Sequence, residues 1–345
     1  MDPLRWISDE YYELNGSSFD VLESPPTALE FARMTHISRP VLIKGFNGVL
    51  QVPAIERWTD EYLIKKMGSS AISVAVTPNG RADAVTPYDG KLYFAEPHIE
   101  QMTMGSFLSK LSPIEEVVKG RPETYYLQSQ NGNLYSSQFY EGLDAPSEYE
   151  PLRDDVPSEV PWCSEALDRR PDAVNLWIGD SGSVSSIHSD PYENIYTVIR
   201  GAKHFTLLPP TEGWCLKERM YPHAAYTRSS DSPALELQPS SSDTPPVRWS
   251  SIAEPHLPGV LPSDAHPIHI TVEKGDTLYL PAGWWHHVRQ DGVTIALNWW
   301  YDMEMRGMNW VLLSFLRTLK DVPDGNEVED NADEVSSIIN ATESE

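Results

Sequence analysis

The chain has 345 residues, of which 40% are hydrophobic and 10% aromatic, a composition that is typical of a folded protein and excludes an intrinsically disordered chain. Its formal net charge of −25 makes nucleic acid a poor partner, because binding to phosphates requires lysine and arginine, whereas a basic protein segment would be attracted. The N-terminus lacks a signal-peptide pattern, and no run of about 18 apolar residues indicates a membrane span, so we expect no membrane association. Only two cysteines occur, which favours a reducing compartment, the cytoplasm or also the nucleus.

Short helices and strands alternate over the first 140 residues. Helices are predicted over 24–34, where Ser24 can cap and Pro25 lies in the first turn, from 58 onwards with Thr59 or Asp60 as the cap, over 104–111, and briefly within the lead-in, 1–20. The β-branched run 40–45, the alternating run 72–76 and the run 124–128 predict strands. We expect residues 1–140 to form an α/β region that packs on a barrel and extends it.

Residues 141–302 are expected to form that barrel. A stretch rich in Pro, Asp and Glu with a short helix at 164–167 precedes strand patterns at 173–179, 194–200, 203–208, 269–272, 277–281 and 293–300. Gly201 predicts a tight hairpin turn, and 229–266 reads as a loose surface excursion. Many short strands without alternating helices predict a mainly β fold with flanking helices, namely an antiparallel double-stranded β-helix, or jelly roll, of the cupin kind.

The C-terminal part contains one apolar helix pattern and an acidic tail. The pattern 309–316, within the segment 303–320, is expected to pack on the barrel or to pair with another subunit, which makes a homodimer plausible. Residues 321–345 carry many acids and no basic residue, and we expect them to be disordered.

A candidate metal site combines His188 and Asp190 with a distant histidine. Residues i and i+2 of a strand face the same side, so the first two side chains point together. A strand and turn, 275–285, present either His286 or His287 nearly a hundred residues later. Two imidazoles and one carboxylate on one face of a metal leave three positions open, as in non-haem Fe(II) oxygenases.

Lys203 is the candidate for binding an anionic cosubstrate. It lies among the apolar residues of a strand that follows the first two ligands, so an inward position is expected. Its ammonium could bind the far carboxylate of a dicarboxylic acid whose near end chelates the metal. Ser185 could offer a hydroxyl to the same carboxylate, and Tyr126 could offer its phenol from a neighbouring strand.

These residues and their neighbours resemble the JmjC oxygenases. The resemblance is closest to the jumonji-domain-containing protein seven type of lysyl hydroxylase, and the hydroxylase factor inhibiting HIF is a further relative. It covers roughly residues 20 to 318. The stretches that carry it are His188-Ser189-Asp190, Asn194, Arg200-Gly201-x-Lys203, Pro209-Pro210, Leu280-Pro281-x-x-Trp284-Trp285-His286-His287-Val288, Asn298-Trp299-Trp300-Tyr301 and, outside the barrel, 74–85 and 161–167.

The resemblance implies the cofactors and their ligands. It implies Fe(II) held by His188, Asp190 and His286, which selects between the two adjacent histidines. It implies 2-oxoglutarate held by Lys203 with help from Tyr126 and Ser185, where the family usually has Thr in place of Ser185. Asn194, Asn298 and Trp300 match positions that line the cosubstrate pocket in the family.

The resemblance also implies the reaction and its substrate. A lysine side chain in a protein would be hydroxylated at C-3, with 2-oxoglutarate converted to succinate and CO2. The implied substrates are developmentally regulated GTP-binding proteins, and Glu193 and Asp83 are candidate acids for the lysine ammonium. Trp284, Trp285 and Trp300 are expected to form an apolar shell around the reacting centre.

Two alternatives stay open at this point. An N-methyl-lysine demethylase shares the first step and releases formaldehyde, although many such enzymes carry Glu where this chain has Asp190. A non-catalytic cupin that serves as an acidic interaction module is the second. A peptidase finds no support, since there is neither a His-Glu-x-x-His motif nor a nucleophile elbow.

Overall fold

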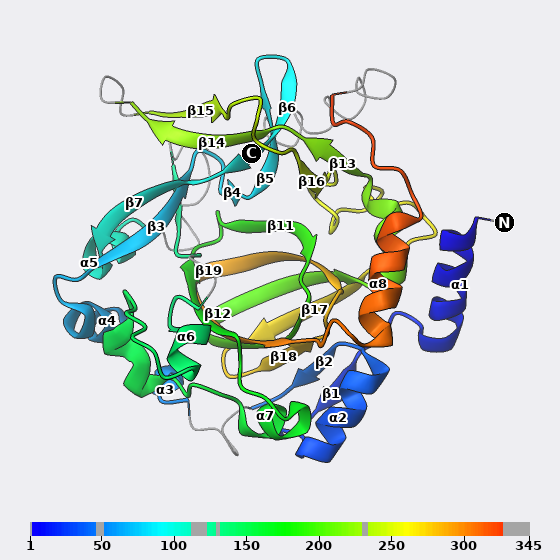
Figure 1. Cartoon of the computed structure of the whole chain (residues 1–345). Coiled ribbons are helices and arrows are strands. Elements are labelled where there is room, and N and C mark those ends of the chain that lie inside the picture. The colour runs from blue at the N-terminus through cyan, green and yellow to red at the C-terminus, as the bar shows by residue number, and fades with distance from the viewer. Residues whose placement is uncertain (1, 46–51, 112–122, 129–131, 230–233, 327–345) are drawn as a thin grey trace.

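Two long bent strands, β12 (Tyr192–Leu208) and β19 (Trp285–Asp302), form the centre of the computed structural model (Figure 1). The structure describes residues 2–45, 52–111, 123–128, 132–229 and 234–326. The two strands pair antiparallel along most of their length, within a sheet that has ten strands in this described part of the chain. This arrangement is the predicted jelly roll.

In the pairing register, the two halves of each long strand have different neighbouring strands. The first half of β12 pairs with β18 (Thr277–Leu280), and its second half pairs with β17 (Ile268–Glu273). The second half of β19 pairs with β10 (Ala173–Gly179), and its first half pairs with β11 (Val184–Ser189).

The hairpin predicted at Gly201 is wrong. Gly201 has φ +74° and lies at a shift in the register of β12, so the backbone bends there and stays in the ladder instead of reversing. Gly292, with φ 56°, lies at the corresponding bend of β19, which is why the last predicted strand is eight residues too short at its N-terminal end, beginning at 293 instead of 285.

Both faces of this sheet are buried. Ile295, Leu297 and Trp299 of β19 pack into a core shared with the flanking helices, whereas Ala296 and the intervening residues face the barrel interior. On the outer face lie the helices α2 (Ala28–Ile37), α3 (Ala54–Arg57), α4 (Asp60–Met67), α5 (Met104–Leu108) and α7 (Pro161–Leu167), with the 3-10 helix Glu150–Asp155. Because successive residues of a strand point to opposite faces, the same strands contribute to the core under the helices and to the core inside the barrel.

The N-terminal elements extend the sheet, and α2 begins later than the sequence suggests. β1 (Asp20–Leu22) and β2 (Val41–Ile43) join the edge of β18, and β9 (Tyr135–Ser136) joins β10. α2 is capped by Thr27, which forms a capping box with Glu30, so Ser24 and Pro25 lie before the helix. Thr59 caps α4 as predicted. α1 (Pro3–Asn15) occupies most of the expected lead-in.

A layer of shorter strands covers one mouth of the barrel (Figure 1). It contains β3 (Ala71–Thr77), β4 (Arg81–Ala82), β5 (Ala84–Tyr88), β6 (Lys91–Glu96), β7 (His98–Thr103), β8 (Thr124–Tyr126), β13 (Glu218–Tyr221) and β14 (His223–Arg228). Within the described part of 229–266, where the sequence predicts a loose excursion, two strands form: β15 (Leu235–Pro239) extends the sheet of β14, and β16 (Val247–Ser250) pairs with β13. β15 thus forms a local antiparallel pair with β14, and β16 pairs with a strand about 30 residues earlier.

The C-terminal helix α8 (Met308–Thr318) packs beside the 3-10 helix Pro210–Leu216, close to α1 (Figure 1). The first residues of the expected disordered tail are ordered, because Asn326 donates to and accepts from the main chain of Leu92. The rest of the tail, from 327 on, lies outside the described residues. Within the described part of the chain, no helix has the length and apolar character to cross a membrane.

Candidate metal centre

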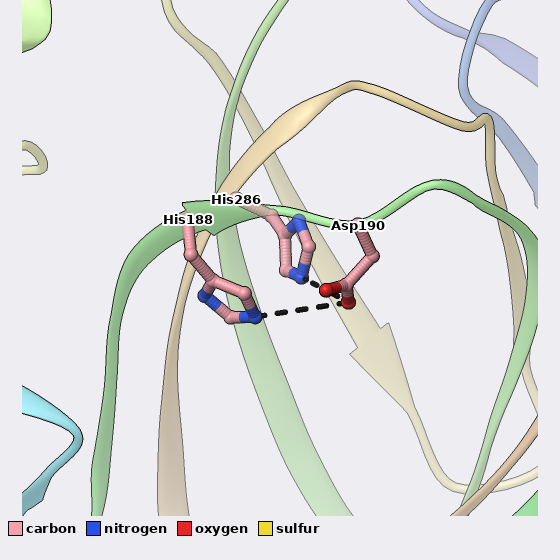
Figure 2. Close-up of side chains that lie close together, drawn as sticks. All are labelled: His188, Asp190 and His286. Atoms are coloured by element: carbon pink, nitrogen blue, oxygen red, sulfur yellow. Dashed lines mark ion pairs between the residues drawn. The ribbon is translucent and has the colours of Figure 1, made fainter. Parts of the chain in front are cut away.

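Three side chains that are far apart in the sequence meet where β11 and β19 pair (Figure 2). His188 on β11 lies opposite His286 on β19, and Asp190 follows the end of β11. Oδ2 of Asp190 lies 3.8 Å from Nε2 of His188 and 3.7 Å from Nε2 of His286. All three donor atoms lie within 4.8 Å of one another, so they face a common point.

Hydrogen bonds to the main chain orient both imidazoles. Nδ1 of His188 donates to the carbonyl oxygen of Ser186 at 2.7 Å, and Nδ1 of His286 donates to that of Trp284 at 3.0 Å. Because a carbonyl oxygen only accepts, Nδ1 carries the proton in each ring and Nε2 keeps its lone pair. Contacts of this kind fix the tautomer and the ring orientation of histidine ligands in metal sites.

The three donors differ in burial. His286 is buried, and desolvation together with the neighbouring His188 lowers the pKa of His286 to about 4, so its ring is neutral near pH 7. His188 and Asp190 are partly exposed because they line a cavity. The set thus has one closed side and one open side, as a metal with free coordination positions requires.

A cavity of about 370 Å³ lies between the barrel and the strands that cover it. The metal triad forms part of its wall, and Tyr126 of β8, Trp177 of β10 and Trp249 of β16 form other parts. The sequence-predicted residues Ser185, Asn194, Asn298 and Trp300 also line it. Its volume suits a small dicarboxylate beside a substrate side chain.

Lys203 is a buried basic residue that contacts Tyr126, a residue of the cavity wall. The residue is 2% exposed, and its Nζ donates to the hydroxyl of Tyr126 at 3.1 Å. No described carboxylate forms an ion pair with it, and burial lowers the pKa of Lys203 to about 7. Burial also raises the pKa of Tyr126, against a hydrogen bond with Ser185. A buried amine whose only described hydrogen-bond partner is a phenol lacks a counter-charge that an anion would supply.

A hydrogen-bonded network of asparagine side chains lines part of the cavity. Oδ1 of Asn298 accepts from Nε1 of Trp177 at 2.8 Å, and its Nδ2 donates to Oδ1 of Asn194 at 3.1 Å. Trp300 stacks on Tyr192 with ring centroids 5.0 Å apart. These contacts hold polar and aromatic groups at defined positions beside the triad.

Several sequence-based assignments are wrong. Glu193 does not line the cavity: its carboxylate accepts from Tyr279 at 2.7 Å and from the main chain of Ala282 at 3.4 Å, within the core. Trp284 and Trp285 also lie outside the cavity lining and pack in separate apolar clusters. Their aromatic run reflects packing of β19 and the turn before it.

Sequence reasoning missed Trp249, Phe94 and Gln128 in the cavity wall. The Trp249 ring stacks on His188 with centroids 6.0 Å apart. Gln128 donates to Oδ2 of Asp83 at 3.2 Å, and Asp83 lines the cavity as well. The alternation of Val247 and Trp249 with Arg248 and Ser250 was the available signal for a strand at Trp249.

Comparisons with known proteins agree with this architecture. Residues 26–307 match the model of a cupin-like domain. The chain is 37% identical over 291 residues to "Bifunctional peptidase and (3S)-lysyl hydroxylase JMJD7" of Homo sapiens, which covers 82% of this chain and 84% of the relative.

Two further relatives align over similar lengths. The chain is 36% identical over 323 residues to "Lysine-specific demethylase JMJ32" of Arabidopsis thaliana, covering 88% of this chain and 87% of the relative. It is 33% identical over 322 residues to "JmjC domain-containing protein E" of Dictyostelium discoideum, covering 85% and 86%.

Proposed function

Since the chain belongs to the cupin-like JmjC family and is a 2-oxoglutarate-dependent oxygenase, we propose that it hydroxylates C-3 of a lysine side chain in a protein substrate. The observation that carries this proposal is one cavity lined by the metal triad, by Tyr126, which binds the buried Lys203, and by Asp83, a carboxylate without a described cation. A GTP-binding protein of the developmentally regulated type is the proposed partner.

His188, Asp190 and His286 are the proposed Fe(II) ligands. Their residue types suit Fe(II), and the main-chain hydrogen bonds already direct both Nε2 lone pairs at the point that Asp190 faces. When bound, Fe(II) and 2-oxoglutarate supply dioxygen activation coupled to decarboxylation, which yields succinate and CO2. The protein's own residues bind and orient the cosubstrate and the substrate, and they exclude water.

Lys203 is proposed to bind the distal carboxylate of 2-oxoglutarate. Its burial makes a charge-assisted hydrogen bond strong, and Tyr126 lies where it can share the same carboxylate. Ser185 is proposed to support Tyr126. Asn194, Asn298 and Trp300 are proposed to line the remainder of the cosubstrate pocket.

Asp83 is proposed to bind the substrate ammonium. Burial raises its pKa, as does Glu96, whereas His188 opposes that shift. Gln128 is its described hydrogen-bond partner, and a lysine ammonium would supply the missing positive charge. Peptide substrates that carry lysine would also be drawn to a protein with a net charge of −25.

A mass measurement tests the proposal. The protein is incubated with Fe(II), labelled 2-oxoglutarate and a lysine-containing fragment of the GTP-binding protein, and the expected product is a fragment with one added oxygen on lysine. Asp83→Asn is expected to raise the KM for the fragment about tenfold while leaving the KM for 2-oxoglutarate unchanged, because a charged hydrogen bond contributes about 1.5 kcal/mol or more. Cosubstrate turnover with unmodified lysine would reject the lysyl assignment and spare the oxygenase.

Demethylation of N-methyl-lysine is the second candidate, favoured by the identity with the plant relative. A methylated ammonium keeps its positive charge and would fit Asp83 equally well. Formaldehyde release from a methylated peptide, without stable addition of oxygen to the unmethylated one, would assign the demethylase reaction.

We propose a homodimer through α8 and a location in the cytoplasm or the nucleus. Met308, Val311, Leu312 and Phe315 are exposed on α8, with values from 44% to 77%, and form an apolar face that a second copy would cover. Light scattering of the protein and of a Phe315→Asp variant tests the dimer. The two cysteines are buried and unpaired, which supports a reducing compartment.

A further inference from the structure

We propose that Glu254, His256 and His287 form a second divalent-metal site, suited to Zn(II), on the face of β19 opposite to the triad. His287 follows His286 directly, so the two side chains point to opposite faces of the strand. Glu254 and His256 belong to the segment that follows β16. The site goes beyond the proposed oxygenase function, because its ion would hold structure together.

The three donors are close enough for one ion. Oε2 of Glu254 lies 3.2 Å from Nδ1 of His256 and 4.0 Å from Nε2 of His287. A ligand atom from each residue lies within 4.8 Å of the others, and the two imidazoles stack with centroids 5.3 Å apart. Zinc bonds of about 2.0 to 2.1 Å in a tetrahedral site place ligand atoms roughly 3.3 Å apart, so a small inward movement completes the set.

The histidines lack other partners. His287 is 0% exposed, and neither of its ring nitrogens has a hydrogen-bond partner among the described residues. Nδ1 of His256 is buried without one as well. A buried imidazole without hydrogen bonds is destabilising, and an unpaired group of this kind points to an ion or a water molecule. Two imidazole lone pairs beside one carboxylate favour the ion.

The surrounding charges select the kind of ion. Arg81 of β4 forms an ion pair with the other oxygen of Glu254, which orients the carboxylate and leaves Oε2 available. Arg289 lies near His256 and adds a second positive charge. The positive charges of both arginines disfavour the binding of a hard ion such as Ca²⁺, which is held mainly by electrostatic attraction. Zn(II) also forms covalent bonds with imidazole nitrogens.

The ion would connect the covering strands to the catalytic strand. Trp249 of β16 lies five residues before Glu254 and stacks on His188 across the cavity. The hydroxyl of Ser250 donates to the main chain of Leu216 at 2.7 Å, so this segment already has one anchor. A second anchor on His287 would fix the wall of the cavity against β19.

Zinc stoichiometry in a variant without the triad tests the site. His188→Ala/Asp190→Ala removes two ligands of the first site, and this full-length protein, stripped by a chelator, is titrated with Zn(II) and freed of excess metal. We expect one zinc per chain by elemental analysis, and a melting temperature that rises when zinc is added.

Adding His256→Asn to that variant is expected to remove both the zinc and the melting shift, and Glu254→Gln to weaken both. His223→Asn is the matched control, since His223 is a partly exposed histidine beside Glu96 and belongs to neither cluster. It should leave one zinc per chain. Absence of zinc from the variant without the triad, or zinc that persists after His256→Asn, would overturn the proposal.

Discussion

Replacing Lys203 with methionine should stabilise the protein without cosubstrate and abolish tight binding of 2-oxoglutarate. Both effects follow from a buried ammonium that has no anionic partner among the described residues. Burial lowers the pKa of Lys203 from its ordinary value of 10.5 to about 7. That lowering corresponds to about 5 kcal/mol of unfavourable burial of the charge at a pH below 7.

The sign of the pH dependence follows from proton binding. Between pH 7 and 10.5 the unfolded chain keeps the lysine proton and the folded chain loses it, so the contribution of Lys203 to stability becomes less unfavourable as the pH rises. Methionine keeps the length of the side chain and removes the charge. Even half of this free energy, about 2.5 kcal/mol, would raise Tm by about 5 to 10 °C at pH 6.5, at roughly 2 to 4 °C per kcal/mol.

The effect on binding has the opposite sign. A hydrogen bond to a charged group contributes about 1.5 to 3 kcal/mol, so Lys203→Met should weaken the binding of 2-oxoglutarate roughly 10- to 100-fold. In the unsubstituted protein, cosubstrate at about 100 times its Kd should add about 2.7 kcal/mol of stability, and at the same concentration the variant should gain only about 0.4 to 1.4 kcal/mol. The cosubstrate should therefore narrow or reverse the difference in Tm between the two proteins.

The assay is thermal denaturation and calorimetric titration with Mn(II) in place of Fe(II). Lys66→Met is the control, because Lys66 is a surface residue paired with the exposed Asp154. It should change neither Tm nor the Kd by much. A Lys203→Met protein that binds 2-oxoglutarate normally, or that melts at a lower temperature without it, would refute the reasoning.

Three further predictions concern the metal ligands, the cosubstrate pocket and the scaffold. His188→Ala should reduce Fe(II) binding and turnover by about 100-fold or more, measured by metal titration and succinate formation. Tyr126→Phe should raise the KM for 2-oxoglutarate about fivefold with kcat retained, since one hydrogen bond of about 1 kcal/mol is lost. Asp155→Ala should lower Tm by about 5 °C or more, because buried Asp155 accepts hydrogen bonds from Tyr62, Trp58 and Arg57. Denaturation scans check this last effect. The difference in Tm between the two proteins should shrink as the pH falls below 3.8, the ordinary carboxyl pKa, because the hydrogen bonds outweigh burial and lower the pKa of Asp155.

The parts of the site that could be predicted depend on local geometry. Residues i and i+2 of a strand share a face whatever the rest of the fold does, so His188 and Asp190 could be paired from the sequence. The choice between His286 and His287 could not be made from spacing, because adjacent residues of a strand differ only in which face is the inner one. The family resemblance supplied that choice, and the structure places His286 beside Asp190.

The parts that could not be predicted depend on partners far away in the sequence. Gly201 is compatible with a reversal or with a bend, and only the strands on both sides of β12 decide between them. Trp249 reaches His188 because β16 pairs with β13, and no local signal announces that pairing. The sequence made Glu193 a candidate for binding the substrate, but in the structure its carboxylate accepts a hydrogen bond from Tyr279 in the core.

The two bent strands explain why the triad and the cosubstrate residues share one cavity. β19 carries His286 in its first half and Asn298 in its second, while β12 carries Asn194 before its bend and Lys203 after it. A straight pair of strands would keep these groups along one ladder, spread over about 40 Å at 3.3 Å per residue. Bends at the two glycines fold each strand back over the same interior, so residues of both halves line one cavity. A side chain at Gly201 would clash with Thr294 of β19 and would disturb both halves of β12.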